Sequence, residues 1–372
     1  MIATGDRRRV RVWDLPTRVY HWTQLALVVA SLYTGFVAPE SWMGVHVAAG
    51  YGLVALIVFR LVWGIYGFEY SRIASFAYPP RRVIESLRGL FLLRPPHAIG
   101  HNPLGAMMVF ALMAVLIALT ATGLMVLGGE ERQGVLRGVI SFDIGAAAKE
   151  VHEGLVWTLM AMVALHVTGV VVESVLGGDN LAWAMITGDR HLPAGLPVPE
   201  PRRARPRAAA LATLGICAVL GVTAAGLSQV PVPGERPLVM DPAYARECAA
   251  CHGLFHPSLL PAGSWRQVMA TLDDHFGEDA SLAPDVADGI ATFLTANAAE
   301  TWHTEAANRF RRVAATDPRR ITATPYWIAK HGEIDKSVYA RRSITSGANC
   351  IACHRDALTP WFADQAIVIP TE

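Results

Sequence analysis

Residues 151–166 read VHEGLVWTLMAMVALH, an apolar stretch with a histidine near each end. His152 and His166 are fourteen residues apart, which is close to four turns of an α-helix. The two side chains therefore share one helix face and lie ~21 Å apart along the axis. A histidine inside a bilayer is costly unless it faces the interior of a bundle and has a function there. The stretch predicts a membrane helix with two polar sites at different depths.

The composition predicts several membrane spans. Of the 372 residues, 52% are apolar and only 17% are charged, whereas a soluble protein of this length would carry more charge. Five segments are long and apolar enough to cross a hydrocarbon core of roughly 30 Å. They are 20–38, 44–68, 104–127, 151–176 and 208–230.

The distribution of arginine predicts the orientation of these spans. Arginines are frequent before the first span, between the second and third, and between the fourth and fifth. The short loop after the first span has no Lys or Arg, and the loop 128–150 carries charges of both signs. This positive-inside pattern places the N-terminus in the cytoplasm and the C-terminus on the far side. The span 208–230 then acts as an internal signal anchor that exports residues 231–372 without a cleavable peptide.

The depth of each histidine decides how the membrane histidines pair. His21 begins the first span on the cytoplasmic side, and His46 begins the second span on the outer side. The fourth span starts outside, which places His152 outer and His166 inner. We therefore expect His21 to pair with His166, and His46 with His152. Each pair can supply two imidazole nitrogens to one iron, and single glycines at 50 and 169 leave room for a porphyrin.

The exported segment contains two C-x-x-C-H motifs, CAACH at 248–252 and CIACH at 350–354. In such a motif two thiols add to the haem vinyl groups and the adjacent histidine is the proximal ligand. One motif alone could instead be half of a zinc site. Two exported copies, each with its own histidine, favour covalent haem. The predicted haem residues are Cys248, Cys251, His252, Cys350, Cys353 and His354.

The segments WDLPTRVYHW, GVHVAAGYGL, GHNPLGAMM, VHEGLVWTLMAMVALH and WAMITGDR resemble the bacterial cytochrome b561 family, over roughly residues 8–190. That family includes the cytochrome b subunits of nickel-iron hydrogenases. The resemblance implies a four-helix bundle with two b haems that exchanges electrons with membrane quinone, ubiquinone or menaquinone. It also implies a bacterial inner membrane. Its axial ligands carry over onto the four histidines that the helix geometry already pairs.

The segments GLFHPSLLPAGSWRQVM, LDDHFGEDASL and RRITATPYWIAKHGEI resemble the dihaem cytochrome c family, over about 245–358. The resemblance implies that both irons have two histidine ligands. The residues offer several distal candidates, namely His256, His275, His303, His331, Met240 and Met269. We place His275 on the first c haem and His331 on the second, with His256 as the main competitor. Met269 is favoured as core packing and His303 as a surface residue.

Three further residues are candidates for contacts with a haem propionate or with quinone. His101 precedes the third span on the cytoplasmic side. Arg60 and Glu173 lie toward the cytoplasmic ends of the second and fourth spans. For Arg60 the competing interpretation is a side chain that extends to the membrane interface.

The predicted fold is an all-α membrane protein in four parts. Residues 1–190 form the cytochrome b561-like bundle, and 191–207 form a Pro- and Arg-rich cytoplasmic linker. Residues 208–230 are the membrane anchor, and 231–372 form a periplasmic dihaem c domain. Nothing in the sequence resembles a nucleotide-binding loop, a flavin fold or a hydrolytic triad, and no nucleic-acid partner is expected.

The order of the parts predicts an electron path. Quinol would be oxidised at the b bundle, and two b and two c haems would carry the electrons to a periplasmic haem protein. The dihaem resemblance makes a small oxygen-binding haem protein a reasonable acceptor. Because the cofactors carry the chemistry, we predict no catalytic side chain, and whether the protein is an enzyme in its own right stays open. The alternatives are a superoxide:quinone oxidoreductase and an anchoring subunit of a hydrogenase or dehydrogenase.

Overall fold

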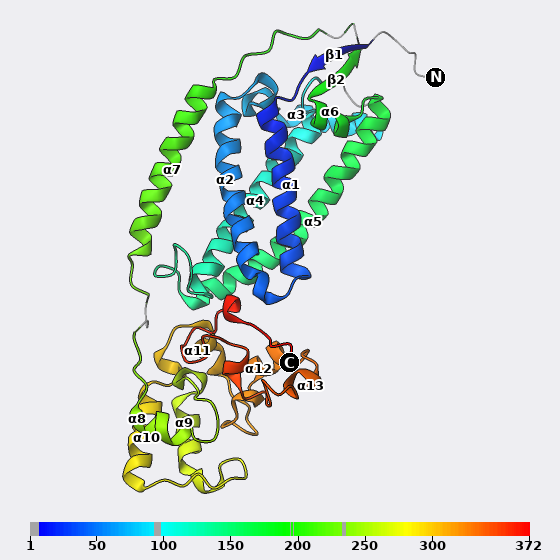
Figure 1. Cartoon of the computed structure of the whole chain (residues 1–372). Helices are drawn as coiled ribbons and strands as arrows, with labels where there is room; N and C mark the ends of the chain where they lie inside the picture. Colours follow the sequence, from blue (N-terminus) through cyan, green and yellow to red (C-terminus); the bar gives the residue numbers. More distant parts are fainter. Residues whose placement is uncertain (1–6, 93–97, 194, 196, 233–235) are drawn as a thin grey trace. The chain divides into compact units, whose positions relative to one another are not determined.

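The computed structural model describes residues 7–92, 98–193, 195, 197–232 and 236–372. Figure 1 shows a chain built almost entirely of helices. The long ones are α1 (Leu15–Phe36), α2 (Met43–Tyr66), α4 (Pro103–Gly129), α5 (Phe142–Gly177) and α7 (Pro206–Ser228). The all-α expectation is confirmed, except for one short pair of strands.

Four helices in the described residues are long and apolar enough to cross a membrane, so this is an integral membrane protein. They are Glu40–Tyr66, Pro103–Gly129, Phe142–Gly177 and Pro206–Ser228. The first of the five expected spans is the 22-residue helix α1, which is not among them. The reason is composition, because polar residues from His21 to Gln24 lower the mean hydropathy of α1.

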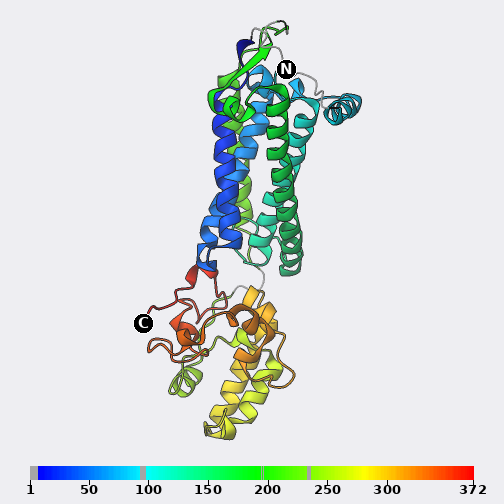
Figure 2. The ribbon, with the colours of Figure 1, turned by 90° about the vertical axis from the view of Figure 1, so that its right-hand side faces the viewer.

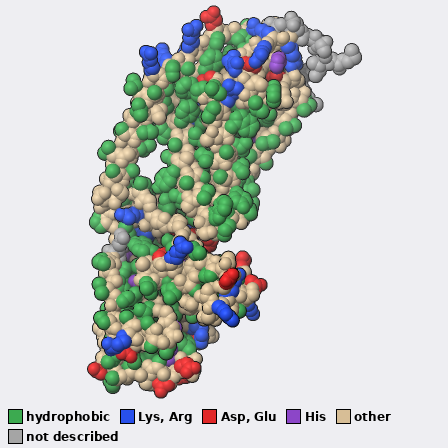
Figure 3. Space-filling model, in the orientation of Figure 1, with side chains coloured by type: hydrophobic (Ala, Val, Ile, Leu, Met, Phe, Trp, Pro, Cys, Tyr) green, Lys and Arg blue, Asp and Glu red, His purple; other side chains and the backbone are tan. Residues whose placement is uncertain are grey.

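The chain divides into two compact units, which are described separately. The first unit contains residues 1–37, 45–123 and 148–225, and the second contains 38–44, 124–147 and 226–372. In the first unit, α1, α2, α4 and α5 enclose an apolar core. Leu53 of α2, Leu119 of α4 and Leu159 of α5 are buried there. Apolar side chains also cover the outer surface of these helices, with Lys and Arg at the end that carries β1 (Figure 3).

Helix α7 also belongs to the first unit, and Figure 1 shows it apart from the four-helix core. In Figure 2 it is seen behind these helices. It is attached at the arginine-rich end, where Ala209 is buried against Val62 and Trp63 of α2. Backbone bonds reinforce this contact, since the amide of Arg205 donates to the carbonyl of Tyr66 at 2.8 Å. The last residues of the expected linker are therefore held in place by backbone hydrogen bonds.

Two short strands form a sheet that the sequence did not predict. Strand β1 (Arg7–Arg11) pairs antiparallel with β2 (Asp189–Pro193), with Arg7 opposite Pro193. The buried carboxylate of Asp189 accepts from Arg9 Nε at 2.6 Å and from Arg11 Nε at 2.9 Å. Strand β2 includes residues 191–193, which the sequence assigned to a loose linker. Positions 194 and 196 of that linker lie outside the described residues.

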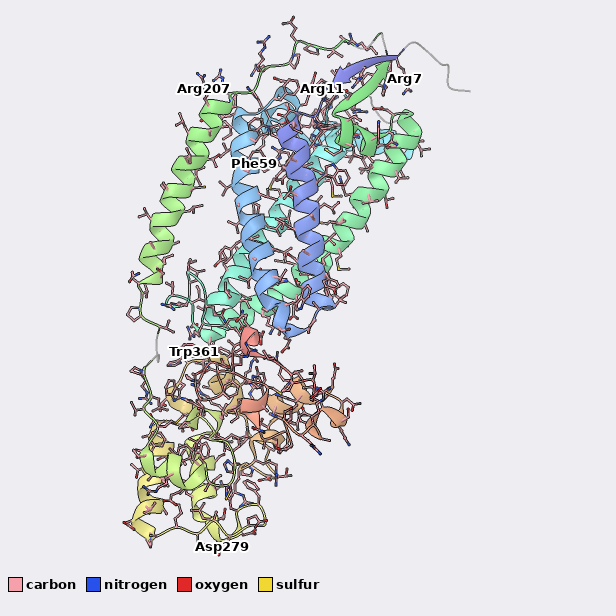
Figure 4. All side chains as sticks on the ribbon, in the orientation of Figure 1. Arg7, Arg11, Phe59, Arg207, Asp279 and Trp361 are labelled. Atoms are coloured by element: carbon pink, nitrogen blue, oxygen red, sulfur yellow. The ribbon has the colours of Figure 1, made fainter. Side chains whose placement is uncertain are left out.

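Two short helices complete the arginine-rich end of the first unit. Helix α3 (Pro80–Phe91) connects α2 to α4 and carries an exposed Arg81–Glu85 ion pair. Helix α6 (Leu181–Thr187) ends at Gly188, which has a φ of 91°. A Cβ at Gly188 would lie 2.5 Å from the carbonyl oxygen of Trp13, so only glycine fits this close approach. Figure 4 shows Arg7, Arg11 and Arg207 at this same end.

The second unit consists of short helices around its own apolar core, which contains Leu259, Trp265, Ile290 and Leu294. The helices are α8 (Pro242–Cys248), α9 (Ala262–Ala270), α10 (Pro284–Ala296), α11 (Glu305–Phe310), α12 (Pro325–His331) and α13 (Lys336–Tyr339). Segments 38–44 and 124–147, which we call the connecting segments, pack against residues 226–372 in this unit.

Candidate haem centres

His46 and His152 face each other across the interior of the first unit. His46 comes from α2 and His152 from α5, and their ring centres are 6.3 Å apart. An imidazole nitrogen binds a metal ion at about 2.0 Å and lies about 1.1 Å from its own ring centre. Two imidazoles on opposite sides of one ion therefore have ring centres about 6.2 Å apart. The spacing of His46 and His152 fits an iron held between them.

Two threonines fix the orientation of these rings. The Nδ1 atom of His46 lies 3.1 Å from Thr34 Oγ1, and that of His152 lies 3.0 Å from Thr122 Oγ1. Each hydroxyl donates to the carbonyl four residues earlier, at 2.8 Å in both cases. Each threonine oxygen then accepts from an Nδ1–H, and the carbonyl of Ser31, also 3.1 Å from His46 Nδ1, accepts from the same group. This arrangement leaves Nε2 of both rings free to bind a metal.

A glycine follows each of these threonines and lies beside the histidine ring. A Cβ at Gly35 would lie 3.7 Å from Cε1 of His46, and a Cβ at Gly123 would lie 3.4 Å from Cε1 of His152. The repeated Thr-Gly pair is a sequence signal that our sequence analysis missed. It noted Gly50 and Gly169 instead, where an added Cβ would meet nothing within 4 Å.

His21 of α1 and His166 of α5 form the second histidine pair of the first unit. Their rings are close enough to interact electrostatically, and Nδ1 of His21 is buried without a hydrogen bond. The ring of Trp22 meets that of His21 edge-on at 5.2 Å. The structure therefore brings together the same pairs that the depth argument predicts.

His101 lies beside the His21–His166 pair, between two aromatic rings. The ring centres of Trp13 and Phe76 are both 4.7 Å from that of His101. Its Nδ1 atom is buried without a hydrogen bond. Burial, with a smaller contribution from the charge of Arg60, lowers the pKa of His101 to about 3. The ring is therefore neutral at physiological pH.

Arg60 and Glu173 both have partners inside the first unit. Arg60 is 5% exposed and donates to the carbonyl of Ser71 at 2.9 Å. It does not extend to the interface, so that competing interpretation is wrong. Glu173 accepts a short hydrogen bond from Asn102, the residue after His101. The three candidate residues therefore gather at the His21–His166 end.

In the second unit, His252 and His275 stand face to face, with ring centres 6.2 Å apart and planes 21° apart. His252 belongs to the first C-x-x-C-H motif, whose Cys248 is the last residue of α8. The Nδ1 atom of His252 lies 2.7 Å from the carbonyl of Gly253, which leaves Nε2 for a metal. We call Cys248, Cys251, His252 and His275 the first c site.

A tight hairpin positions His275. Its amide donates to the carbonyl of Glu278 at 2.8 Å, and the two residues between them have positive φ, 58° at Phe276 and 100° at Gly277. Positive φ at both central residues defines a type I′ turn, which normally requires Gly or Asn. Arg319 and Arg320 lie over the Phe276 ring, at 5.3 and 4.6 Å from its centre, and hold this uncommon conformation.

His331 and His354 form the corresponding pair in the C-terminal half, with ring centres 6.1 Å apart. His331 ends α12, and its Nδ1 lies 3.0 Å from the carbonyl of Trp327. The Trp327 ring stacks on it at 4.6 Å, with planes only 4° apart. The backbone carbonyl and the ring of Trp327 therefore both orient this histidine. We call Cys350, Cys353, His354 and His331 the second c site.

The two c sites are neighbours. A Cβ at Gly253, directly after His252, would lie 3.4 Å from the side chain of Ile351. Ile351 is one of the two residues between Cys350 and Cys353. The two motifs therefore touch, and groups bound at them would be close together.

The main competitor for a distal role, His256, has another task. It is 1% exposed, and its Nδ1 lies 2.8 Å from Ser258 Oγ and accepts from the Ser258 amide at 3.2 Å. Its ring also packs edge-on against Trp302 at 5.0 Å. Burial lowers the pKa of His256 to about 4. His256 therefore caps the short helix 257–259 as a neutral acceptor.

The remaining distal candidates also have structural roles. Met240 and Met269 pack against the core of the second unit. The carbonyl of His303 accepts from Arg132 Nε at 2.9 Å. Among the described residues, no three His, Cys, Asp or Glu side chains gather as a metal-ion site, whereas zinc in proteins takes three or four ligands. Paired imidazoles with thiols beside them fit haem.

Two family models match this chain, and several known proteins are similar to parts of it. Models of prokaryotic cytochrome b561 and of dihaem cytochrome c match residues 12–188 and 244–362. A probable Ni/Fe-hydrogenase B-type cytochrome subunit of Bradyrhizobium diazoefficiens is 28% identical over an alignment of 228 residues, which covers 51% of this chain and 90% of that protein. A dihaem cytochrome c structure from Rhodobacter sphaeroides is 39% identical, over 33% of this chain and 97% of its own, with a TM-score of 0.29. Another from Shewanella baltica OS155 is 30% identical, over 36% and 96%, with a TM-score of 0.30.

The first unit holds paired histidines inside an apolar helix bundle, and the second holds two histidine pairs with cysteines beside them. Together with the family matches, these features define a membrane electron-transfer cytochrome that takes both haem b and haem c. The chain belongs to the prokaryotic cytochrome b561 family over residues 12–188 and to the dihaem cytochrome c family over residues 244–362.

The threonine contacts lead to a prediction about one haem potential. Changing both Thr34 and Thr122 to valine removes the side-chain acceptors of His46 and His152 Nδ1–H. The rings then lose basicity, and the midpoint potential of the haem between them should rise by up to about 40 mV, equivalent to ~1 kcal/mol for one electron. Redox titration of the purified protein measures this.

The control for this prediction is Thr120→Val, because Thr120 makes the same helical backbone bond two residues away. It should leave both b potentials unchanged. An equal shift at the other b haem, or none at either, would show that the threonines do not act on this iron.

Proposed function

We propose that the protein carries electrons between membrane quinol and a soluble haem protein, through two b haems and two c haems. The observation that supports this best is the ring spacing of 6.1–6.3 Å in three separate histidine pairs. Iron between two imidazoles is six-coordinate and has no open position for a substrate. Such sites favour electron transfer over chemistry at the metal.

The proposed ligands follow the four histidine pairs. His21 with His166, and His46 with His152, hold the b haems. Cys248 and Cys251 bind the first c haem covalently, with His252 proximal and His275 distal. Cys350 and Cys353 bind the second, with His354 proximal and His331 distal. In this proposal 1–190 is the b bundle, 208–230 the anchor and 231–372 the c domain.

The quinone site is proposed at the His21–His166 end, around His101. A neutral ring between Trp13 and Phe76 suits a flat, apolar head group, and the unpartnered Nδ1 of His101 could hydrogen-bond a quinone oxygen. Glu173 lies at the same end, and its carboxylate can accept a proton that leaves quinol. Arg60, which stays protonated, can donate to a propionate or to a quinone oxygen.

The orientation is proposed from charge. The end of the first unit that carries Arg7, Arg11 and Arg207 would face the cytoplasm of a bacterial inner membrane (Figure 4). The c domain would then lie in the periplasm, where its acceptor is a small haem protein. Four exposed acidic residues lie within four positions of His275 in the sequence, namely Asp273, Asp274, Glu278 and Asp279. They favour a partner whose contact surface is basic.

Quinol-driven haem reduction tests the proposal. With menaquinol or ubiquinol as donor, the b haems of the purified full chain should be reduced first and the c haems next. His101→Leu should slow this reduction at least tenfold, while dithionite still reduces all the haems. The matched control is His191→Leu, an exposed histidine at the same end, which should react at the wild-type rate. Haems that stay oxidised with both quinols would contradict the proposal.

The hydrogenase-subunit alternative has a specific observation in its favour, because the curated relative from Bradyrhizobium diazoefficiens is a hydrogenase cytochrome subunit. Co-purification of large dehydrogenase subunits from native membranes would support it. Superoxide oxidation is less favoured, since it calls for an open basic surface near a b haem. The connecting segments instead place Glu40 and Glu130 in ion pairs with Lys330 and Arg309 of the c domain.

A further inference from the structure

The connecting segments do not contact the c domain evenly. Segment 38–44 meets it beside the second c site, where Glu40 Oε1 lies 2.7 Å from Lys330 Nζ. Lys330 is the residue directly before His331, the distal ligand of that site. The carboxylate of Glu40 interacts electrostatically with the rings of both His331 and His354.

A second contact reaches the same site from its proximal side. The short helix Asp364–Ala366 packs on the short helix Glu40–Trp42. Residues just after Asp364 run beside the second motif, since Val368 N donates to the carbonyl of Cys353 at 2.8 Å and Ile367 forms a bridge with His354. Both axial histidines of the second c site are therefore tied to segment 38–44.

Segment 38–44 continues directly into the helix of a b-haem ligand. Glu40 is six residues before His46, and α2 begins at Met43. Segment 124–147 also contacts the C-terminal half of the c domain. The buried Glu130 pairs with Arg309 at 2.5 Å, and Gln133 meets Gln365 at 3.4 Å.

The first c site is formed by other parts of the second unit, namely the end of α8 and the hairpin at His275. In Figure 4, Asp279, four residues after His275, is at one end of this unit, and Trp361, next to the His354 neighbour Phe362, is at the opposite end. Phe276 is 42% exposed beside His275, so this site is open to a partner. The contact between Gly253 and Ile351 links the two sites internally.

From these contacts we propose that the second c haem alone exchanges electrons with the b haems, and that the first c haem exchanges them with the soluble partner. The Glu40–Lys330 ion pair holds the second site against the segment that leads to His46. The order is the same whichever way the electrons flow. This order of haems rests on the proposed electron path through four haems but not on quinol as the donor.

Removal of one c haem at a time tests the order in the full-length protein. A light flash in the presence of a soluble flavin delivers electrons to the haems. Absorbance then follows how these electrons redistribute between the b haems and the c haems. The variant C248A/C251A, without the first haem, should exchange with the b haems at the wild-type rate. In the variant C350A/C353A the rate of this exchange should fall at least 100-fold, although dithionite still reduces the remaining c haem. Exchange that survives in C350A/C353A, or is lost only in C248A/C251A, overturns the proposal.

Charge reversal gives a test in which all four haems stay in place. Lys330→Glu and Glu40→Lys should each slow the exchange about tenfold, and the double variant K330E/E40K should recover to within twofold of wild type. The matched control is Arg246→Glu, because Arg246 forms an exposed pair with Glu247 at 2.9 Å beside the first c site. A slower exchange in R246E than in K330E would contradict the order. Since no quinol is used, failure of the quinol reaction would leave both measurements intact.

Discussion

Replacing His152 with alanine should remove one b haem and stop electron transfer between the b and c haems. His46 alone cannot keep the iron six-coordinate, and Thr122 loses the ring that it orients. Acid-acetone extraction followed by a pyridine haemochrome assay should show one extractable haem per chain in place of two. The two covalent haems should remain. Quinol-driven reduction of the c haems should fall by at least 100-fold.

The partner variant and the control make the result specific. His166→Ala should remove the other b haem and leave the signal of the haem between His46 and His152. Thr158→Ala changes the same helix at a site whose hydroxyl bonds only within α5, and it should keep both haems. If either histidine variant retained both b signals, the pairing of His46 with His152 and His21 with His166 would be wrong.

Replacing His331 with glycine should open the second c haem to carbon monoxide. The unmodified protein should not react, because in the proposed ligation His331 and His354, whose ring centres are 6.1 Å apart, would fill both axial positions of that iron. In H331G the vacant position should bind one carbon monoxide per chain, with a shift from low-spin to high-spin in the absence of the gas. His275→Gly should have the same effect at the first c haem.

His256 provides the control for this experiment. His256→Asn keeps a side-chain acceptor for Ser258 and removes the ring, so carbon monoxide should still not bind. Binding to H256N would make His256 the distal ligand in place of His275. Tight binding to the unmodified protein would mean that one c haem has an open position, and the carrier proposal would give way to a terminal reductase.

The sequence predicted the histidine pairs because depth and helical period are properties of one segment at a time. A count of fourteen residues puts His152 and His166 on one face, and span direction then assigns His21 and His46 their partners. The c sites were predictable for a similar reason, since each C-x-x-C-H motif contains three of its own haem residues within five positions.

The contacts that orient these ligands were not predictable from local pattern. Thr34 and Thr122 look like ordinary threonines in apolar helices, and only the packing of α1 on α2 and of α4 on α5 brings them to a histidine. The ion pair between Glu40 and Lys330 joins residues 290 positions apart. Long-range pairs of this kind leave no periodic signal in the sequence.

The pairing of β1 with β2 also has a consequence for the biosynthesis of the chain. Arg9 and Arg11 share ion pairs with the single carboxylate of Asp189, which is synthesised about 180 positions later. While the first helices insert, those arginines therefore act at full charge and can hold the N-terminus on its side of the membrane. Strand pairing becomes possible only after α5 and α6 have been made, and the cost of closing so long a segment grows only slowly with its length. In the proposed orientation, part of the charge that holds the N-terminus in place is thus paired only after the first helices have inserted.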